Sequence, residues 1–230
     1  MPTASVRASA PVNPDGGAVP VSRQLLSREE RQAQILRAAA TAFAHAGFAA
    51  TSMDDVAAEA GVTKLIVYRH FESKEELYRS VLSAVAARLR DEFLKGLNQP
   101  EPVRRGFTTR SILIVARENP DGFRLLTTHA AREPQFAELA REFKEQGLVV
   151  ADTMIGEMIP DPVVKAWASG VIADYVVQGV LVWLDAGDPA RDDEFVELAS
   201  RGLRGMFLSW ADHDRLPDHV RAELEERHDR

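Results

Sequence analysis

Apolar residues recur every three or four positions along most of the chain from residue 27 onward, and this spacing constrains the fold more than any other feature. The period places apolar side chains on one face of an α-helix, whereas a half-buried strand needs strict alternation. Breaks between the helical segments fall at Gly47, Gly61, Asn119-Pro120 and Pro160-Asp161-Pro162. No alternating segment with hairpin turns is seen, so the sequence predicts an all-α protein with about nine helices.

The predicted helices begin and end at residues that favour helix caps. Ser27 and Glu30 have the spacing of a capping box at the start of the first helix, and Gly47 would end it. Ser73 would cap a longer helix over residues 74–97. The other helices are expected over residues 53–60, 63–70, 102–118, 121–131, 134–159, 163–185 and 192–212.

The composition excludes several classes of protein. Of 230 residues, 45% are hydrophobic and 27% are charged, which rules out a collagen-like or wholly disordered chain. Cysteine is absent, so disulfide scaffolds, cysteine-ligated metals and thiol catalysis are excluded. No apolar run approaches the roughly 18 residues that cross a bilayer, and no signal peptide is evident. We therefore expect a cytoplasmic protein without a transmembrane helix.

The stretch from Thr51 to Lys74, TSMDDVAAEAGVTKLIVYRHFESK, bears most directly on function. Two short helices are joined at EAGV, where Gly61 can supply the positive φ that a tight turn needs. This is the spacing of a helix-turn-helix, whose second helix can enter the major groove of DNA. The chain has a net charge of −7, yet residues 62–71 hold three potentially basic side chains and no acid. Binding a phosphate backbone needs only such a local basic surface.

Helical periodicity divides the second short helix into two faces. Val62, Val67 and Phe71 would pack inward, against Ile35, Phe43, Val56 and Ala57. The outward set is Lys64, Leu65, Ile66, Tyr68, Arg69 and His70. Leu65 and Ile66 could instead be core residues, but one narrow stripe cannot bury both of them together with Val67.

This segment resembles the tetracycline-repressor-like (TetR) family of bacterial transcriptional regulators. The resemblance rests on Gly47-Phe48, Thr51-Ser52-Met53-Asp54-Asp55-Val56-Ala57, Ala60-Gly61-Val62-Thr63-Lys64, Val67-Tyr68-Arg69-His70-Phe71 and Ser73-Lys74-Glu75-Glu76-Leu77, after a first helix over 27–46. The remainder matches only as a helical pattern of suitable length. One departure is Leu65-Ile66, where the family more often has a small residue followed by Ser or Thr, and this affects the base preference.

The resemblance implies which residues contact DNA. Base edges would face Thr63, Lys64, Leu65 and Ile66. Lys64 can donate to guanine, while the two aliphatic side chains can pack on thymine methyl groups. Phosphates would contact Thr51, Ser52, Tyr68, Arg69, His70 and Lys74. Hydroxyl and backbone N–H groups at a helix N-terminus can hold a phosphate, and a phosphate would explain Lys74, which is poorly placed for the helix dipole.

The resemblance also implies the organisation of the chain. We expect a disordered arm over 1–22, a DNA-binding domain over 23–72, a helical effector and dimerisation domain over 73–215 and a charged tail over 216–230. A homodimer would bind a palindromic double-stranded operator. Its interface would use the last two long helices, because 163–185 is apolar all round and Gly170 and Gly179 would admit a partner helix. A central core helix within one subunit is the alternative for 163–185, and different faces of the helix could serve both.

A ligand-responsive repressor of this family would bind an apolar or aromatic small molecule in its second domain. Candidates for the pocket are Phe107, Phe123, His129, Phe136, Trp167 and Tyr175. Aromatic residues at helical spacing are also ordinary core residues, and that reading stays open.

Other classes of function fit the sequence less well. An enzyme is disfavoured because no His-Glu-x-x-His, Gly-x-Ser-x-Gly or P-loop pattern occurs, and we predict no catalytic residue, metal site or cofactor. A helical protein-binding adaptor, or a small-molecule-binding protein without DNA activity, is the alternative. Neither would need an acid-free basic surface on a helix-turn-helix.

Overall fold

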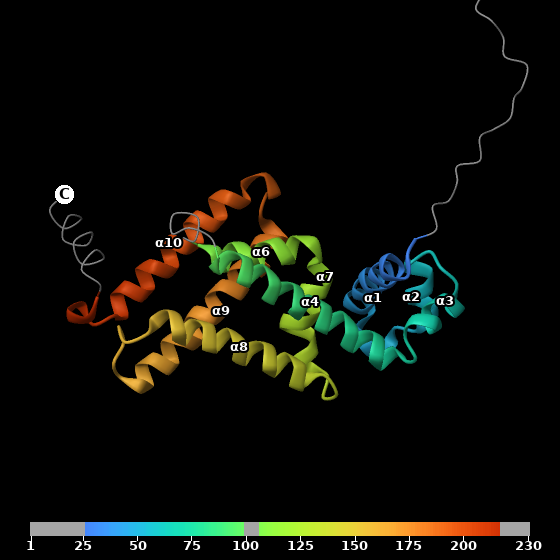
Figure 1. Cartoon of the computed structure of the whole chain (residues 1–230), viewed down its shortest axis with the longest axis horizontal. Coiled ribbons are helices and arrows are strands. Elements are labelled where there is room, and N and C mark those ends of the chain that lie inside the picture. Colours follow the sequence, from blue (N-terminus) through green and yellow to red (C-terminus); the bar gives the residue numbers. More distant parts are fainter. Residues whose placement is uncertain (1–25, 99–105, 217–230) are drawn as a thin grey trace, which may run out of the picture.

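The computed structural model describes residues 26–98 and 106–216, and within these ranges every regular element is helical. Nine α-helices are present in the described part, as the periodicity predicted. Helices α1, α2 and α3 gather at one end of an elongated molecule (Figure 1). Helix α4 runs from this end into a larger helical body built from α6 to α10. The predicted arm over 1–22 lies outside the described residues, as does the tail beyond Leu216.

Local capping sets the boundaries of the first three helices. α1 (Arg28–Ala50) starts at Ser27, whose capping box with Glu30 forms as predicted. Gly47 interrupts it with φ +80°, so the last three residues form a separate turn. α2 (Met53–Glu59) is capped by Ser52, and α3 (Lys64–His70) follows a turn in which Gly61 has φ +64°. Both glycines adopt the left-handed backbone that other residues disfavour.

The side chains of α3 that were expected to face inward do so. Val67 and Phe71 are buried in the same apolar core as Ile35, Phe43 and Val56, and Val62 is half-buried against that core. Because α3 is too short to be stable alone, this packing orients it.

Helix α4 (Lys74–Leu97) joins the two parts of the molecule. Its first turns belong to the core of the first three helices, since Leu77 and Tyr78 are buried there. Further along, α4 packs against α6 (Phe107–Glu118). A second connection runs from α1 to α7 (Pro120–Arg124), where Thr41 Oγ1 donates to Asp121 Oδ2 at 2.8 Å.

Two helices predicted for the larger body differ from the structure, one in helix type and one in its boundaries. The helix expected over 121–131 is α7, followed by a π-helical segment, Leu125–His129, and a 3₁₀ turn, Ala130–Arg132. The helix expected over 134–159 is α8 (Ala137–Ile155). Pro134 lies before it rather than in its first turn.

Tertiary packing explains the shorter α8. Phe136, which precedes it, is fully buried and stacks on Tyr78 with ring centroids 4.3 Å apart. This packing holds Phe136 in a non-helical conformation, so α8 begins only after it. At the other end Gly156 has φ +56° and terminates the helix before Ile159.

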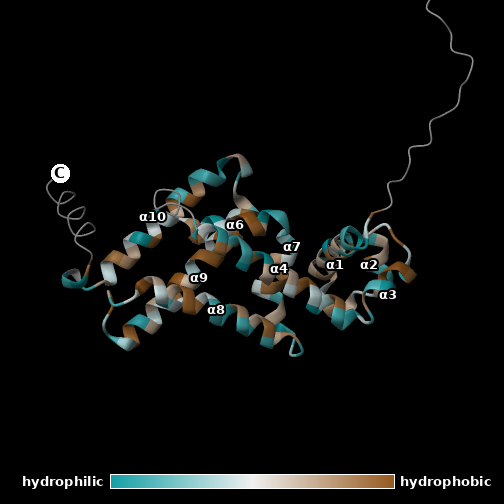
Figure 2. Cartoon of the chain, in the orientation of Figure 1, coloured by the Kyte–Doolittle hydropathy of each residue, from teal (hydrophilic) through white to brown (hydrophobic). Residues whose placement is uncertain are grey.

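The last two long helices are α9 (Pro162–Ala186) and α10 (Asp192–Trp210). Contrary to the expectation of no membrane-spanning segment, α9 is long and apolar enough to cross a bilayer by length and composition alone. The core helices of globular proteins pass the same test. Figure 2 shows how apolar residues are distributed over α9 and its neighbours. Only 28% of the most apolar window of α9 is buried within the chain, so much of the apolar surface of α9 is not covered by this chain.

Candidate nucleic-acid interface

The exposed side of α3 carries most of the side chains that were expected to face DNA. We call Thr63, Lys64, Leu65, Tyr68 and Arg69 the recognition face, because all five are exposed. Leu65 is 63% exposed and Tyr68 is 44% exposed. Ile66 was expected on this face but is half-buried against the apolar core, so the helix exposes one aliphatic side chain here rather than two.

An acidic side chain from α2 joins the recognition face. Lys64 Nζ lies 2.6 Å from Asp54 Oδ2, with both side chains more than half exposed. The hydrogen bond to Asp54 and the attraction of its charge raise the pKa of Lys64. Lys64 also lies 5.9 Å from the centroid of the Tyr68 ring. The count of basic and acidic side chains in the sequence missed Asp54 because it covered only residues 62–71. The helix-turn-helix brings the first turns of α2 and α3 together.

Thr51 does not fit the role of a phosphate contact. Its side chain is 2% exposed, and its hydroxyl donates to the carbonyls of Gly47 at 2.8 Å and Ala42 at 3.2 Å. These bonds close the break in α1 at Gly47. Thr51 was predicted to hold a phosphate because it precedes a helix, but the hydroxyl faces back into the domain.

Ser52 is exposed, and its hydroxyl caps α2. It accepts from the backbone N–H of Asp55 at 3.2 Å and donates to the Asp55 carboxylate at 2.7 Å. The two bonds that Ser52 donates to this carboxylate, from its hydroxyl and from its backbone N–H, lower the pKa of Asp55. A phosphate at the start of α2 would therefore meet a carboxylate that already uses the same donors.

Lys74 also has partners within the chain. Its Nζ donates to the carbonyls of Phe48 at 2.9 Å and Ala49 at 3.3 Å, and it lies 4.5 Å from the centroid of the Phe48 ring. The lysine thus ties the start of α4 to the end of α1. A phosphate is not needed to explain it, contrary to the expectation from the helix dipole.

The remaining basic side chains extend the surface toward α1. Burial, followed by the charges of Arg28 and Arg31, lowers the pKa of His70. This shift favours the neutral imidazole, so His70 adds less positive charge to α3 than Lys64 and Arg69 do. Arg69 is exposed and forms no ion pair within the described ranges. Arg28 and Arg31 were missed by sequence reasoning, since only the fold brings the first turn of α1 close to the end of α3.

The six predicted pocket residues are spread over α6, α7, the π-helical segment, the residue before α8, and α9. Phe123 and Phe136 are fully buried, and Phe136 also contacts Phe48 with centroids 5.0 Å apart, at the junction with the first three helices. Phe107 packs on Phe93, and His129 ends the π-helical segment.

The other two lie on α9, toward its packing with α10. Trp167 is 52% exposed and packs on Trp210 with centroids 4.6 Å apart. Tyr175 donates to the carbonyl of Ala199 at 3.2 Å. These are packing contacts, as in the alternative that was left open for the aromatic residues, and the pocket stays a prediction.

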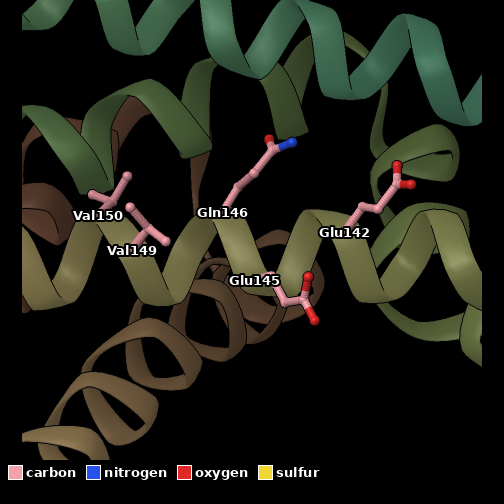
Figure 3. Close-up of a pocket in the computed structure, with 5 residues that line it drawn as sticks. All are labelled: Glu142, Glu145, Gln146, Val149 and Val150. Carbon is pink, nitrogen blue, oxygen red and sulfur yellow. The ribbon is translucent and has the colours of Figure 1, made fainter.

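An open hollow of about 440 Å³ lies elsewhere, on α8. Its lining residues, Glu142, Glu145, Gln146, Val149 and Val150, all belong to that helix (Figure 3). None of the six predicted pocket residues is among them. Within the described ranges, no group of three or more His, Asp or Glu side chains is placed to hold a metal ion.

Comparisons with known proteins agree with this geometry. A family model described as bacterial regulatory proteins, tetR family, matches residues 35–81, which cover most of the first helix, the helix-turn-helix and the start of α4. The chain is 31% identical over 185 residues to the HTH-type transcriptional activator FasR of Mycolicibacterium smegmatis. That match covers 75% of this chain and 80% of FasR.

Solved structures share the fold. A TetR-like transcriptional regulator from Rhodococcus sp. RHA1 is similar over 78% of this chain and 99% of its own, with a TM-score of 0.63 and 19% identity. AibR, solved in complex with isovaleryl coenzyme A and operator DNA, is similar over 76% of this chain and 98% of its own, with a TM-score of 0.58 and 19% identity. The predicted all-α fold with an N-terminal helix-turn-helix domain is confirmed.

Proposed function

Because this chain belongs to the tetR family of DNA-binding bacterial transcriptional regulators, we propose that it binds a palindromic operator as a homodimer and represses transcription until a small-molecule effector releases it. The recognition face carries this proposal. It presents Lys64, Tyr68 and Arg69 beside an exposed Leu65 at one end of the molecule, on a helix whose other side is anchored in the core (Figure 1).

The fold supports a separate role for each of the two parts of the chain. We propose that residues 23–72 bind DNA and that 73–215 bind the effector and the second subunit. The first turns of α4 pack with the DNA-binding helices and its later turns pack with α6, so α4 would transmit movement between the two functions. We further propose a cytoplasmic location, where the operator is found.

Exposed apolar residues on α9 and α10 support a dimer. Val163, Trp167, Val182 and Leu198 are all more than half exposed. A Cβ added at Gly170 or Gly205 would meet no atom of the chain, so both positions leave room for a partner helix. At Gly202 it would meet the Tyr175 hydroxyl at 2.6 Å, so that glycine serves packing within the chain. A bundle of four helices, two from each subunit, would bury these side chains.

The effector part of the proposal has a simple physical form. Two recognition helices fit successive major grooves only when they are about 34–36 Å apart. A ligand that binds better to a dimer with another spacing must lower operator affinity by the same coupling free energy. AibR was solved with both an acyl coenzyme A and operator DNA, which supports an apolar or acyl effector here.

We propose that the protein represses transcription, although the similar FasR is an activator. Excluding polymerase from a promoter requires only an operator-binding surface, whereas activation also requires a surface that contacts polymerase. A reporter gene behind the operator should be expressed more strongly when the protein is removed. Lower expression without the protein would assign it as an activator.

Selection of bound duplexes from a random DNA library tests DNA binding and dimerisation together. We expect a palindrome whose half-sites are centred about one helical turn apart. A Lys64→Ala/Tyr68→Ala variant should lose the enriched sequence while keeping the helical circular dichroism of the wild type. A single unpaired half-site would contradict the dimer, and no enrichment would contradict operator binding.

A further inference from the structure

The most exposed large apolar side chain among residues 26–98 is on the recognition face. Leu65 is 63% exposed, compared with 52% for Leu94 and 44% for Tyr68. It lies outside the apolar core, whereas its neighbours Ile66 and Val67 pack against or within it. Leu65 therefore contributes little to folding, and its aliphatic surface stays in water unless a partner covers it.

The polar groups around Leu65 point to what that partner is. Lys64, immediately before it, is held by Asp54 at 2.6 Å, so the first turn of α3 is close to neutral. Tyr68 and Arg69 follow at the spacings that share one helix face with Leu65. A phosphate would favour the arginine end of this face. The aliphatic end is suited to an apolar group that lies deeper in the groove.

The major groove offers one apolar group to such a side chain. Among the four bases, only thymine presents a methyl group there, while the other exposed groups are hydrogen-bond donors and acceptors. We propose that Leu65 selects a T·A pair in each operator half-site by packing on the thymine methyl group, and that Ile66 takes no part. This specificity rests on the proposed function, because it requires α3 to enter the groove.

Replacing thymine with uracil removes the methyl group and leaves every hydrogen-bonding group in place. With the selected operator, each thymine is replaced in turn and binding is measured by competition with the parent duplex. One position per half-site should weaken binding by about fourfold, the effect of losing one buried methyl contact. Replacing both symmetric thymines should weaken it by about fifteenfold, since distant sites add.

Two variants identify the side chain that reads the methyl group. Leu65→Ala should bind parent and uracil duplexes equally well, and selection with it should lose the thymine preference at that one position. Ile66→Val removes one methylene from the half-buried neighbour and should keep the full uracil effect. Melting curves will show that both variants are folded, which we expect of Leu65→Ala because the side chain is exposed.

The outcomes separate this proposal from the function on which it rests. If the wild type binds a selected operator but every uracil duplex competes like the parent, Leu65 does not read thymine, and operator binding stands. If the uracil effect persists in Leu65→Ala, another residue, such as Tyr68, reads the methyl group and the assignment is wrong. If no sequence is selected at all, operator binding itself fails and the proposal fails with it.

Discussion

Lys64 and Lys74 belong to the same sequence motif, but the folded chain gives them different partners. Lys74 is half-buried and donates to two carbonyls at the end of α1, so its hydrogen bonds stabilise the first three helices. Lys64 is exposed and pairs with Asp54. Exposed ion pairs are weak and are screened by salt, so DNA can displace the carboxylate from Lys64.

Removing the carboxylate at residue 54 should strengthen non-specific DNA binding. In Asp54→Asn the charge of Lys64 is no longer offset, so more counterions are released when the face meets phosphates. Affinity for a random duplex should rise, and log K should fall more steeply with log[salt] than in the wild type. Fluorescence anisotropy at several salt concentrations measures both quantities.

Glu59→Gln provides the matched control for this charge change. Glu59 lies on the same short helix and is exposed, but no ion pair connects it to the recognition face within the described ranges. It should change the salt dependence less than Asp54→Asn does. Equal effects of the two variants would mean that only net charge matters and that the contact with Lys64 does not.

His70 should make the stability of the protein fall at mildly acidic pH. Burial and the nearby Arg28 and Arg31 hold its pKa below the ordinary value of about 6.5. Between the two pKa values the unfolded chain binds a proton that the folded chain does not, so lowering the pH favours unfolding. This contribution is present above about pH 6.5 and is lost as the pH falls below it.

Melting temperatures of His70→Gln and wild type between pH 7.5 and 5.5 test this effect. The fall in melting temperature should be smaller in the variant. His45→Gln is the control, because His45 is exposed on α1, and it should behave like the wild type. A wild-type slope that persists in His70→Gln would assign the acid sensitivity to other groups.

Among the helices, the Phe136 ring links the segment before α8 to the DNA-binding helices. Phe136 contacts Tyr78 of α4 and Phe48 at the end of α1, with centroids 4.3 and 5.0 Å away. The guanidinium of Arg79 lies 5.7 Å from its centroid. Movement of α8 would therefore reach the helix-turn-helix through this contact as well as through α4.

Truncating this ring should destabilise the protein strongly. Phe136→Ala leaves a cavity among fully packed aromatic rings, and such changes cost roughly 3–5 kcal/mol of unfolding free energy. Phe136→Leu should cost clearly less, because it refills part of the space. Urea unfolding measures both, and Leu94→Ala, at a position that is 52% exposed on α4, should cost less than Phe136→Ala. Equal losses for Phe136→Ala and Leu94→Ala would show that Phe136 is not a main packing contact.

At the scale of the whole molecule, the recognition face and the exposed apolar surface of α9 and α10 lie on different parts of an elongated chain (Figure 1). Val163, Val182 and Leu198 stay exposed within one subunit. A dimer through this surface would leave both recognition faces free. The two surfaces can therefore be tested separately by mutation.

A bulky residue at Gly205 should separate the subunits without unfolding them. An added Cβ at this position meets nothing within 4 Å in the chain, and replacing a helical glycine favours the helix. Each Gly205→Arg subunit should therefore stay folded and melt cooperatively as a monomer. The arginine side chain should block the approach of a partner helix. Light scattering should give the 25.4 kDa chain mass, compared with twice that value for the wild type.

Gly205→Ala adds only a methyl group and should remain a dimer. Loss of the palindromic footprint in Gly205→Arg, with weak binding to a single half-site retained, would tie operator affinity to dimerisation. A Gly205→Arg protein of dimeric mass would move the interface away from this part of α10.

Features that depend on neighbours a few residues apart could be predicted without a structure. Caps at Ser27, Ser52 and Ser73 form because each hydroxyl meets a backbone N–H three residues later, and Gly61 permits the turn. Helical periodicity was enough to place Val67 inside and Leu65 outside. The family resemblance drew on this same local pattern, which is why the helix-turn-helix could be predicted.

Which groups far apart in the sequence become partners depends on how the helices pack. Lys74 meets a carbonyl 26 residues before it, and Lys64 meets an acid 10 residues before it. Thr51 turns inward to carbonyls of α1, and Phe136 leaves α8 to fill a gap among distant rings. Periodicity states which face of a helix is apolar but not what that face meets. For the same reason, aromatic side chains that fill a core and those that line a cavity have the same spacing in the sequence, and their tertiary partners, such as Tyr78 for Phe136, distinguish them.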